Sequence, residues 1–302
     1  MYRTIIAGCN GRQRGRGAVS LAHAICSATG ARLVLVGVYH HPPLPFPGSY
    51  ADQRGTLEHD LRALRDELAP EALVRVEADL SPAHALRRVA AAEHADLLVV
   101  GSRHRRGLQR IVEGDQAMQV LHGASCAVAV APDPVAPRAR LERIGVGIDA
   151  TPESAMALVI ARELAHHAGA RLSLHAIVDE AIPGWIGLSV TPSYADALEE
   201  LMVDRRAAAE ELLARRLEAC EGVTAEGELV VGDPAGELIL ASEGLDLLIL
   251  GSRRWGPVRR LALGSTSERV IRHGACPVLV PPRRADAEHA DALLGALVVA
   301  AR

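Results

Sequence analysis

An internal repeat constrains this chain more than any other feature. Residues 5–10 (IIAGCN) align without a gap over residues 144–149 (IGVGID). At the same offset of 139, residues 30–33 fall on residues 169–172, and both segments read GARL. Self-similarity on this scale indicates one structural unit present twice. A length of 302 residues is enough to bury two separate cores.

The second copy is longer than the first. Residues 95–102 (ADLLVVGS) align with residues 245–252 (LDLLILGS) at an offset of 150, so the second copy holds eleven extra residues. We expect them in residues 179–194, where proline, glycine and serine predict an irregular excursion. Prolines 132, 134 and 137 favour a linker, because proline continues neither a helix nor a central strand. These features predict a first domain at 1–132, a linker at 133–141, a second domain at 142–282 and a C-terminal tail at 283–302.

Aliphatic runs alternate with helical patterns in each copy. The second copy predicts helices at 198–220 and 265–273, and a helix start at Thr151, followed by proline and glutamate. It predicts strands near 143–148, 171–178, 224–231, 247–251 and 278–280. Such alternation requires right-handed crossovers and a parallel sheet with helices on both faces. We therefore expect an α/β fold of two tandem, doubly wound, five-stranded parallel-sheet domains.

The amino-acid composition argues against several classes of protein function. The net charge of −4 is unlike that of a general nucleic-acid binder. All 33 basic residues are arginine, which excludes a Walker-type phosphate loop and a Schiff-base lysine. The five cysteines are scattered and form no metal or disulfide pattern, so they predict buried thiols, with a redox sensor as the alternative. With no signal peptide and no apolar run of membrane-spanning length, we expect a cytoplasmic protein.

The candidate site follows the first and fourth strands of the second copy. Ligands of parallel sheets bind beyond the carboxyl ends of the strands, where the winding direction reverses. There, Gly264, Ser265 and Thr266 open a predicted helix, and a glycine, hydroxyls and free amides together favour an anion. Asp149 ends the first strand, and its carboxylate can accept hydrogen bonds from a ribose or a base amine. The combination predicts a nucleotide, whereas the alternative is a helix-capping aspartate beside an ordinary helix start.

These residues resemble the universal stress protein family. Its members carry, after the fourth strand, a glycine, two residues, a second glycine, nine residues, a third glycine and then serine or threonine. Here Gly251 matches the first glycine, Arg254 stands at the second, and Gly264 with Ser265 closes the motif. Residues 230–235 and 267–280 also resemble the family's third helix start and its last helix and strand. The resemblance covers residues 2–282 and implies an adenine nucleotide α-hydrolase-like, Rossmann-like fold.

The resemblance also implies a ligand. In ATP-binding members, the first-strand aspartate contacts adenosine, the end of the second strand lines the base, and the glycine motif holds ribose and phosphates. Arg254 departs from this pattern, since its side chain would crowd the ribose or pair with a phosphate. The expected ligand is ATP or a related adenine nucleotide, with or without Mg²⁺. By position, the implied nucleotide-binding residues are Asp149, Ala150, Val178, Gly251, Arg253, Arg254, Gly264, Ser265 and Thr266.

The first copy departs further from the family pattern. Asn10 replaces the aspartate and Asp115 replaces the phosphate-facing serine or threonine, although Gly101 and Gly114 remain. A carboxylate at the helix start repels a phosphate and itself occupies the favourable electrostatic position. We expect a degenerate N-terminal site.

The sequence thus predicts a tandem, non-enzymatic stress-response protein that binds ATP or a related nucleotide mainly in its C-terminal domain. No spacing indicates a catalytic triad, a carboxylate pair or a metal site. The alternatives are a nucleotide-independent interaction protein and, less favoured, a weak ATPase or nucleotidyl-transferring enzyme. The expected partners are an adenine nucleotide and the chain itself, as an intramolecular pseudo-dimer with its last strands near the pseudo-twofold axis or as a homodimer. No nucleic acid or membrane partner is expected.

Overall fold

The computed structural model describes residues 2–11, 15–39, 50–103, 116–133, 140–180, 192–252 and 263–282. Its first half contains β1 (Thr4–Gly8), α1 (Arg16–Thr29), β2 (Arg32–Tyr39), α2 (Tyr50–Leu68), β3 (Leu73–Ala78), α3 (Pro82–Ala92), β4 (Leu97–Arg103), α4 (Gln116–Leu121) and β5 (Ala127–Asp133). Its second half contains β6 (Arg143–Ile148), α5 (Pro152–Ala168), β7 (Arg171–Val178), α6 (Pro192–Glu218), β8 (Ala225–Val231), α7 (Pro234–Ala241), a short 3₁₀ helix (Ser242–Gly244), β9 (Leu247–Ile249), α8 (Ser265–His273) and β10 (Val278–Val280).

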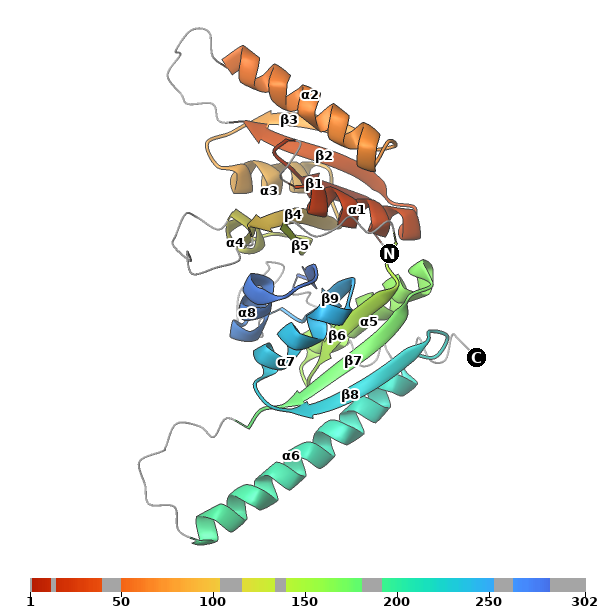
Figure 1. Cartoon of the computed structure of the whole chain (residues 1–302), viewed down its shortest axis with the longest axis vertical. Helices are drawn as coiled ribbons and strands as arrows, with labels where there is room; N and C mark the ends of the chain where they lie inside the picture. Colours follow the sequence, from red (N-terminus) through yellow and green to blue (C-terminus); the bar gives the residue numbers. More distant parts are fainter. Residues whose placement is uncertain are drawn as a thin grey trace.

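The ten described strands form one sheet in the order β3-β2-β1-β4-β5-β10-β9-β6-β7-β8. Within each half all the pairings are parallel, as the alternating pattern predicted. Two buried clusters cover the two faces. One holds apolar residues of α1, α2, α5 and α6, and the other holds those of α3, α4, α7 and α8. The doubly wound α/β prediction is therefore confirmed, and Figure 1 shows the sheet running through both halves.

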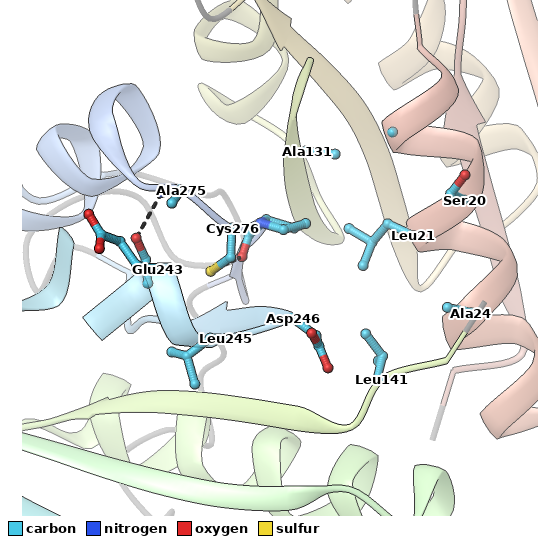
Figure 2. A pocket seen from close by; sticks show the side chains of 13 residues that line it. Ser20, Leu21, Ala24, Ala131, Leu141, Glu243, Leu245, Asp246, Ala275 and Cys276 are labelled. Atoms are coloured by element: carbon cyan, nitrogen blue, oxygen red, sulfur yellow. Dashed lines mark hydrogen bonds between the residues drawn. The ribbon is translucent and has the colours of Figure 1, made fainter. Parts of the chain in front are cut away.

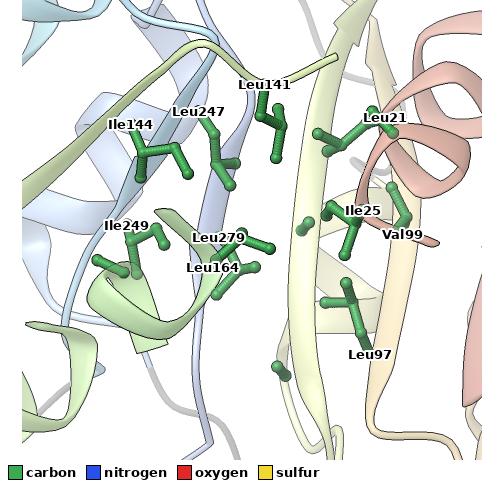
Figure 3. Close-up of a cluster of buried hydrophobic side chains, with 14 of the residues drawn as sticks. Leu21, Ile25, Leu97, Val99, Leu141, Ile144, Leu164, Leu247, Ile249 and Leu279 are labelled. Carbon is green, nitrogen blue, oxygen red and sulfur yellow. The ribbon is translucent and has the colours of Figure 1, made fainter. Parts of the chain in front are cut away.

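The two halves join edge to edge through their last strands. β10 pairs antiparallel with β5, and its Val278, Leu279 and Val280 lie opposite Val130, Ala129 and Val128. Figure 3 shows one apolar cluster spanning this joint, with Leu21 and Ile25 of α1 on one side and Leu164, Ile249 and Leu279 on the other. The adjacent last strands agree with the expected intramolecular pseudo-dimer.

A repeated aspartate clamps the first strand of each half to the fourth. The Asp96 carboxylate accepts hydrogen bonds from the amides of Arg3 and Thr4, at 2.7 and 3.0 Å. Asp246 does the same for the amides of Glu142 and Arg143, at 2.7 and 2.9 Å. The aspartate of the repeated ADLL/LDLL segments is therefore a structural residue that sets strand pairing.

A cavity of about 90 Å³ lies at the joint, between α1 and the loops that precede β6, β9 and β10. Figure 2 shows Leu21 and Leu141 reaching toward it from different elements. The small residues Gly17, Ser20 and Ala24 line its α1 side. At the offset of 139 their counterparts on α5 are the larger Met156, Val159 and Glu163. The small side chains of α1 thus account for space on this side of the joint.

Several sequence-based boundaries need correction. Helix α6 begins at Pro192, inside the predicted excursion, and ends at Glu218 rather than at residue 220; residues 181–191 of that excursion lie outside the described ranges. Strand β9 ends at Ile249, two residues early. Strand β5 continues through Pro132, because at that point the strand pairs with β4 alone and β10 needs no amide from it.

The cysteines are confirmed as buried free thiols. Burial raises the pKa of Cys9, Cys26 and Cys126 to about 12 and that of Cys220 to about 11. Thiols held in the protonated form are poor nucleophiles, which disfavours the redox-sensor alternative. Among the described helices, none combines the length and apolarity needed to span a bilayer.

Candidate functional site

The start of α5 is built from a short polar turn after β6. Thr151 is the N-cap residue, in extended backbone conformation, and its hydroxyl accepts a hydrogen bond from the Ser154 amide at 3.2 Å. Asp149 Oδ1 in turn accepts from the Thr151 amide at 2.8 Å and from the Thr151 hydroxyl. Asp149 therefore supports the cap and does not form it. Asp149 and Ala150 are both exposed at the end of β6.

Gly251 follows β9 and lies in contact with both α5 and α8. A Cβ atom at this position would lie 3.0 Å from the Glu153 carbonyl carbon and 3.1 Å from the Ser154 amide nitrogen. The Gly251 carbonyl also accepts a hydrogen bond from the Ser267 hydroxyl of α8, at 3.1 Å. Glycine is required here because α5 passes so close, which gives the first glycine of the motif a packing reason.

The N-terminus of α8 begins at Gly264, its N-cap residue. Among the described residues, no side chain caps the helix. The Glu268 amide begins the helical bonding pattern by donating to the Gly264 carbonyl at 2.9 Å. A Cβ atom on Gly264 would meet no described atom within 4 Å, while Ser265 is exposed and Thr266 is half-buried. The first-turn amides of a helix without a side-chain cap provide its positive end for an anion.

These three features converge because β6 and β9 are neighbours in the sheet. Helix α5 covers one face and α8 covers the other, so the winding direction reverses between the two strands. The structure thus brings five predicted residues to the carboxyl end of the sheet, at the topological switch point. They are Asp149, Ala150, Gly251, Gly264 and Ser265. Thr266 accompanies them on α8, whereas Arg253 and Arg254 lie outside the described residues.

Val178 lies at the same end of the sheet but points into the protein. It ends β7, its side chain is buried, and its carbonyl accepts a hydrogen bond from the Gly232 amide at 3.0 Å. The side chain therefore belongs to the core, and only backbone near this residue faces that end of the sheet.

An ion pair that the sequence did not reveal borders the site. The two terminal guanidinium nitrogens of Arg269, on α8, donate hydrogen bonds to the Asp233 carboxylate at 2.9 and 2.8 Å. Asp233 also caps α7 by accepting from the Gly236 amide at 3.0 Å. The guanidinium holds the pKa of Asp233 below its usual range. The Asp-Pro helix start was a visible signal, but its partner, 36 residues away, was not.

The N-terminal half has a different turn after β1. Helix α1 begins after Gly15, which has a φ of 91° and no side-chain cap, and Asn10 is exposed. A Cβ atom on Gly15 would lie 2.7 Å from Cys9 Cβ, so this turn depends on glycine. Gly101 lies in β4 and is half-buried. Gly114 and Asp115 fall outside the described residues.

Comparison with known proteins agrees with the two-copy organisation. A sequence model described as the universal stress protein family matches residues 1–132 and again residues 140–282. A universal stress protein of Mycobacterium tuberculosis, Rv2005c, is 26% identical over 275 residues, covering 87% of this chain and 90% of that protein. One from Thermus aquaticus is 34% identical over 136 residues, covering 44% of this chain and 92% of its own.

Solved structures agree on the fold. A universal stress protein from Archaeoglobus fulgidus has a TM-score of 0.65 and 18% identity, with 94% of this chain and 97% of that chain covered. The protein PA1789 of Pseudomonas aeruginosa has a TM-score of 0.64 and 17% identity, with 98% of each chain covered. With the family model matched over both halves, the chain belongs to the universal stress protein family.

Proposed function

We propose that this protein is a cytoplasmic stress-response protein that binds ATP or a related adenine nucleotide in its C-terminal half. The observation that carries the proposal is the carboxyl end of the neighbouring strands β6 and β9. The exposed Asp149 follows β6, and α8, which follows β9, begins at Gly264 with no side-chain cap among the described residues. A carboxylate suits ribose hydroxyls or the adenine amine, and helix amides suit phosphates. The same positions carry the resemblance to ATP-binding family members.

The nucleotide would be held by residues of three elements. Asp149 and Ala150 follow β6, backbone near Val178 ends β7, and Gly251 follows β9. Gly264, Ser265 and Thr266 begin α8. Arg253 and Arg254 follow Gly251 in sequence and supply guanidinium groups for phosphates, and Mg²⁺ would accompany ATP on its phosphate oxygens.

We propose that the N-terminal half has the same fold but does not bind the nucleotide. Its first-strand turn has Asn10 and a glycine-capped helix in place of Asp149 and Thr151. Asp115 stands at the position of Ser265 and would repel phosphate. The domain bounds proposed with this assignment are 1–132 and 142–282, with a linker at 133–141 and a tail at 283–302.

A nucleotide-independent interaction protein is the second candidate. Two observations favour it. Asp149 Oδ1 already accepts hydrogen bonds from Thr151, and Arg254 replaces a glycine of the motif. In this role the protein would act as a dimerisation module, through further pairing of its own copies.

Direct analysis of the purified protein separates the two candidates. The chain is denatured, released small molecules are identified by mass spectrometry, and protein stripped of ligand is titrated with ATP by calorimetry, with and without Mg²⁺. Nucleotide binding predicts a saturable heat with one site per chain. No released nucleotide and no heat at millimolar ATP would leave the interaction protein as the better account.

A further inference from the structure

A second polar cluster lies away from the proposed nucleotide site, on the face of β7 against which α7 packs and on the same face of the neighbouring strand β8. The Ser173 hydroxyl oxygen is 3.0 Å from His175 Nε2, on the same strand. His175 Nδ1 is 3.4 Å from Oε2 of Glu228, on β8. His175 is 9% exposed, whereas the Glu228 side chain is largely in solvent. The Ser173 hydroxyl, the His175 imidazole and the Glu228 carboxylate therefore form a continuous chain of polar contacts.

The carboxylate determines which imidazole nitrogen carries the proton. An ionised glutamate only accepts hydrogen bonds, so Glu228 favours the tautomer with hydrogen on Nδ1. Nε2 then presents its lone pair to the Ser173 hydroxyl at 3.0 Å, which is closer than the Ile144 carbonyl oxygen that accepts from the same hydroxyl at 3.5 Å. Burial lowers the pKa of His175, against the opposing effect of Glu228 and Glu226, so the imidazole is neutral at neutral pH. This is the protonation state in which an imidazole removes a proton from serine.

The fold does not require polar residues here. At the offset of 139, Ser173 and His175 correspond to Val34 and Val36 of β2, which are buried and apolar. In the sheet, Val36 pairs with Arg75, as His175 pairs with Glu228. The first half thus fills the equivalent face with hydrocarbon and places no imidazole–carboxylate pair on it.

A third replacement makes room for the imidazole. Gly145 of β6 corresponds to Ile6 of β1, which is fully buried. A Cβ atom on Gly145 would lie 3.4 Å from His175 Nε2 and 2.3 Å from Leu245 Cδ1. The change from isoleucine to glycine and the changes from valine to serine and histidine therefore fit one another. The three replacements together form one polar cluster rather than a single isolated polar residue.

We propose that Ser173 is an activated nucleophile and a site of acyl modification, with His175 as its general base and Glu228 as the residue that positions the base. The substrate class is a reactive acyl donor, such as a thioester or an aryl ester. Ser173 Oγ bonds to the carbonyl carbon while its proton passes to His175 Nε2. The carbon–sulfur or carbon–oxygen bond then breaks, and the thiol or phenol leaves with that proton.

The surroundings limit this reaction to donors with good leaving groups. Strand β7 lies between β6 and β8, so its backbone amides are committed to the two parallel ladders and do not form an oxyanion hole. Ser173 is half-buried rather than fully buried, so the proposal requires a small reagent that can approach its hydroxyl. The expected product is a stable acyl-serine rather than rapid turnover.

The test is acetylation of the full-length protein by p-nitrophenyl acetate, followed by peptide mass spectrometry. We expect acetylation of Ser173 to be about 100-fold faster than that of the other serines, as general-base assistance implies. His175→Val, which copies Val36, should reduce it to the background rate, and Ser173→Val should remove the label. Glu228→Gln should slow the reaction by about tenfold. The wild-type rate should be independent of pH above the usual histidine range and fall below it, since the His175 pKa is lowered.

Two controls keep the result interpretable. Circular dichroism shows whether each variant is folded, and the valine variants reproduce side chains that the first half already accommodates at these positions. A fluorophosphonate, whose adduct persists, shows whether an acetyl group was simply lost to hydrolysis. Labelling of Ser173 at the rate of other serines, labelling unchanged in His175→Val, or acetylation of His175 itself would each overturn the proposal.

Discussion

Ala129 of β5 and Leu279 of β10 lie opposite each other in the antiparallel joint, and they are the same position of the two copies. The pseudo-twofold axis therefore passes beside this pair. Each copy contributes its last strand, and the buried cluster on the α1 and α5 face continues across the joint. The halves are thus expected to unfold as one unit.

Leu279→Ala tests that cooperativity. Leu279 is fully buried, so the truncation should lower the free energy of unfolding by about 2–5 kcal/mol. Calorimetry should show one transition, shifted as a whole to lower temperature. Two separate transitions, with only one of them shifted, would mean that the halves fold independently.

Ser20→Val should stabilise the protein. The Ser20 hydroxyl is buried beside the joint cavity with no hydrogen-bond partner among the described residues, and its counterpart on α5 is Val159. Valine has two methyl groups in place of the hydroxyl, so the change removes a buried polar atom and fills space, for about 0.5–2 kcal/mol. The urea midpoint measures the change, with Ser27→Val on the exposed face of α1 as the control. An unchanged or lower midpoint for Ser20→Val alone would show that the hydroxyl is satisfied.

The Arg269–Asp233 ion pair predicts a pH dependence. Because Arg269 lowers the pKa of Asp233, the pair contributes stability above the ordinary aspartate pKa of 3.8. That contribution disappears as the pH falls through the lower pKa of the folded state. The difference in urea midpoint between the wild type and Arg269→Gln should therefore be present at neutral pH and vanish in strong acid. A difference that persists unchanged in acid would assign the effect to packing of the arginine.

Asp149→Asn separates ligand contact from helix capping. Asparagine keeps an acceptor for the Thr151 amide and copies Asn10 of the first half, so the unfolding midpoint should change little. Loss of the negative charge should weaken ATP binding by about tenfold, the usual scale of a charged hydrogen bond. A large loss of stability with unchanged affinity would give Asp149 a purely structural role. Both quantities come from one calorimetric series.

Local signals predicted much of the fold. The patterns placed β6, β7, β10 and α8 at the observed bounds, and the Thr151 cap was visible as a hydroxyl before proline. The start of α6 was missed although Thr191 and Pro192 repeat that signal, because the surrounding glycines and prolines favoured a loop. Local periodicity carries no information on contacts between distant strands.

The sequence predicted those parts of the candidate site that follow from the order of strands and helices along the chain. The rule that ligands bind at the switch point placed Asp149 and Gly264 near each other, because β6 and β9 are adjacent. The contacts of Arg269 with Asp233 and of His175 with Glu228 depend on helix packing and strand register. A single sequence gives neither, so these partners emerged only from the structure.

The central claim is that the C-terminal half alone binds the nucleotide. The direct measurement is ATP titration by calorimetry of Gly264→Glu and of its counterpart in the first half, Gly114→Glu. A side chain on Gly264 would meet no described atom within 4 Å, so the fold should persist while a carboxylate blocks the anion site. The account predicts no ATP binding by Gly264→Glu and wild-type binding by Gly114→Glu. Binding that survives in Gly264→Glu, or is lost in Gly114→Glu, would contradict it.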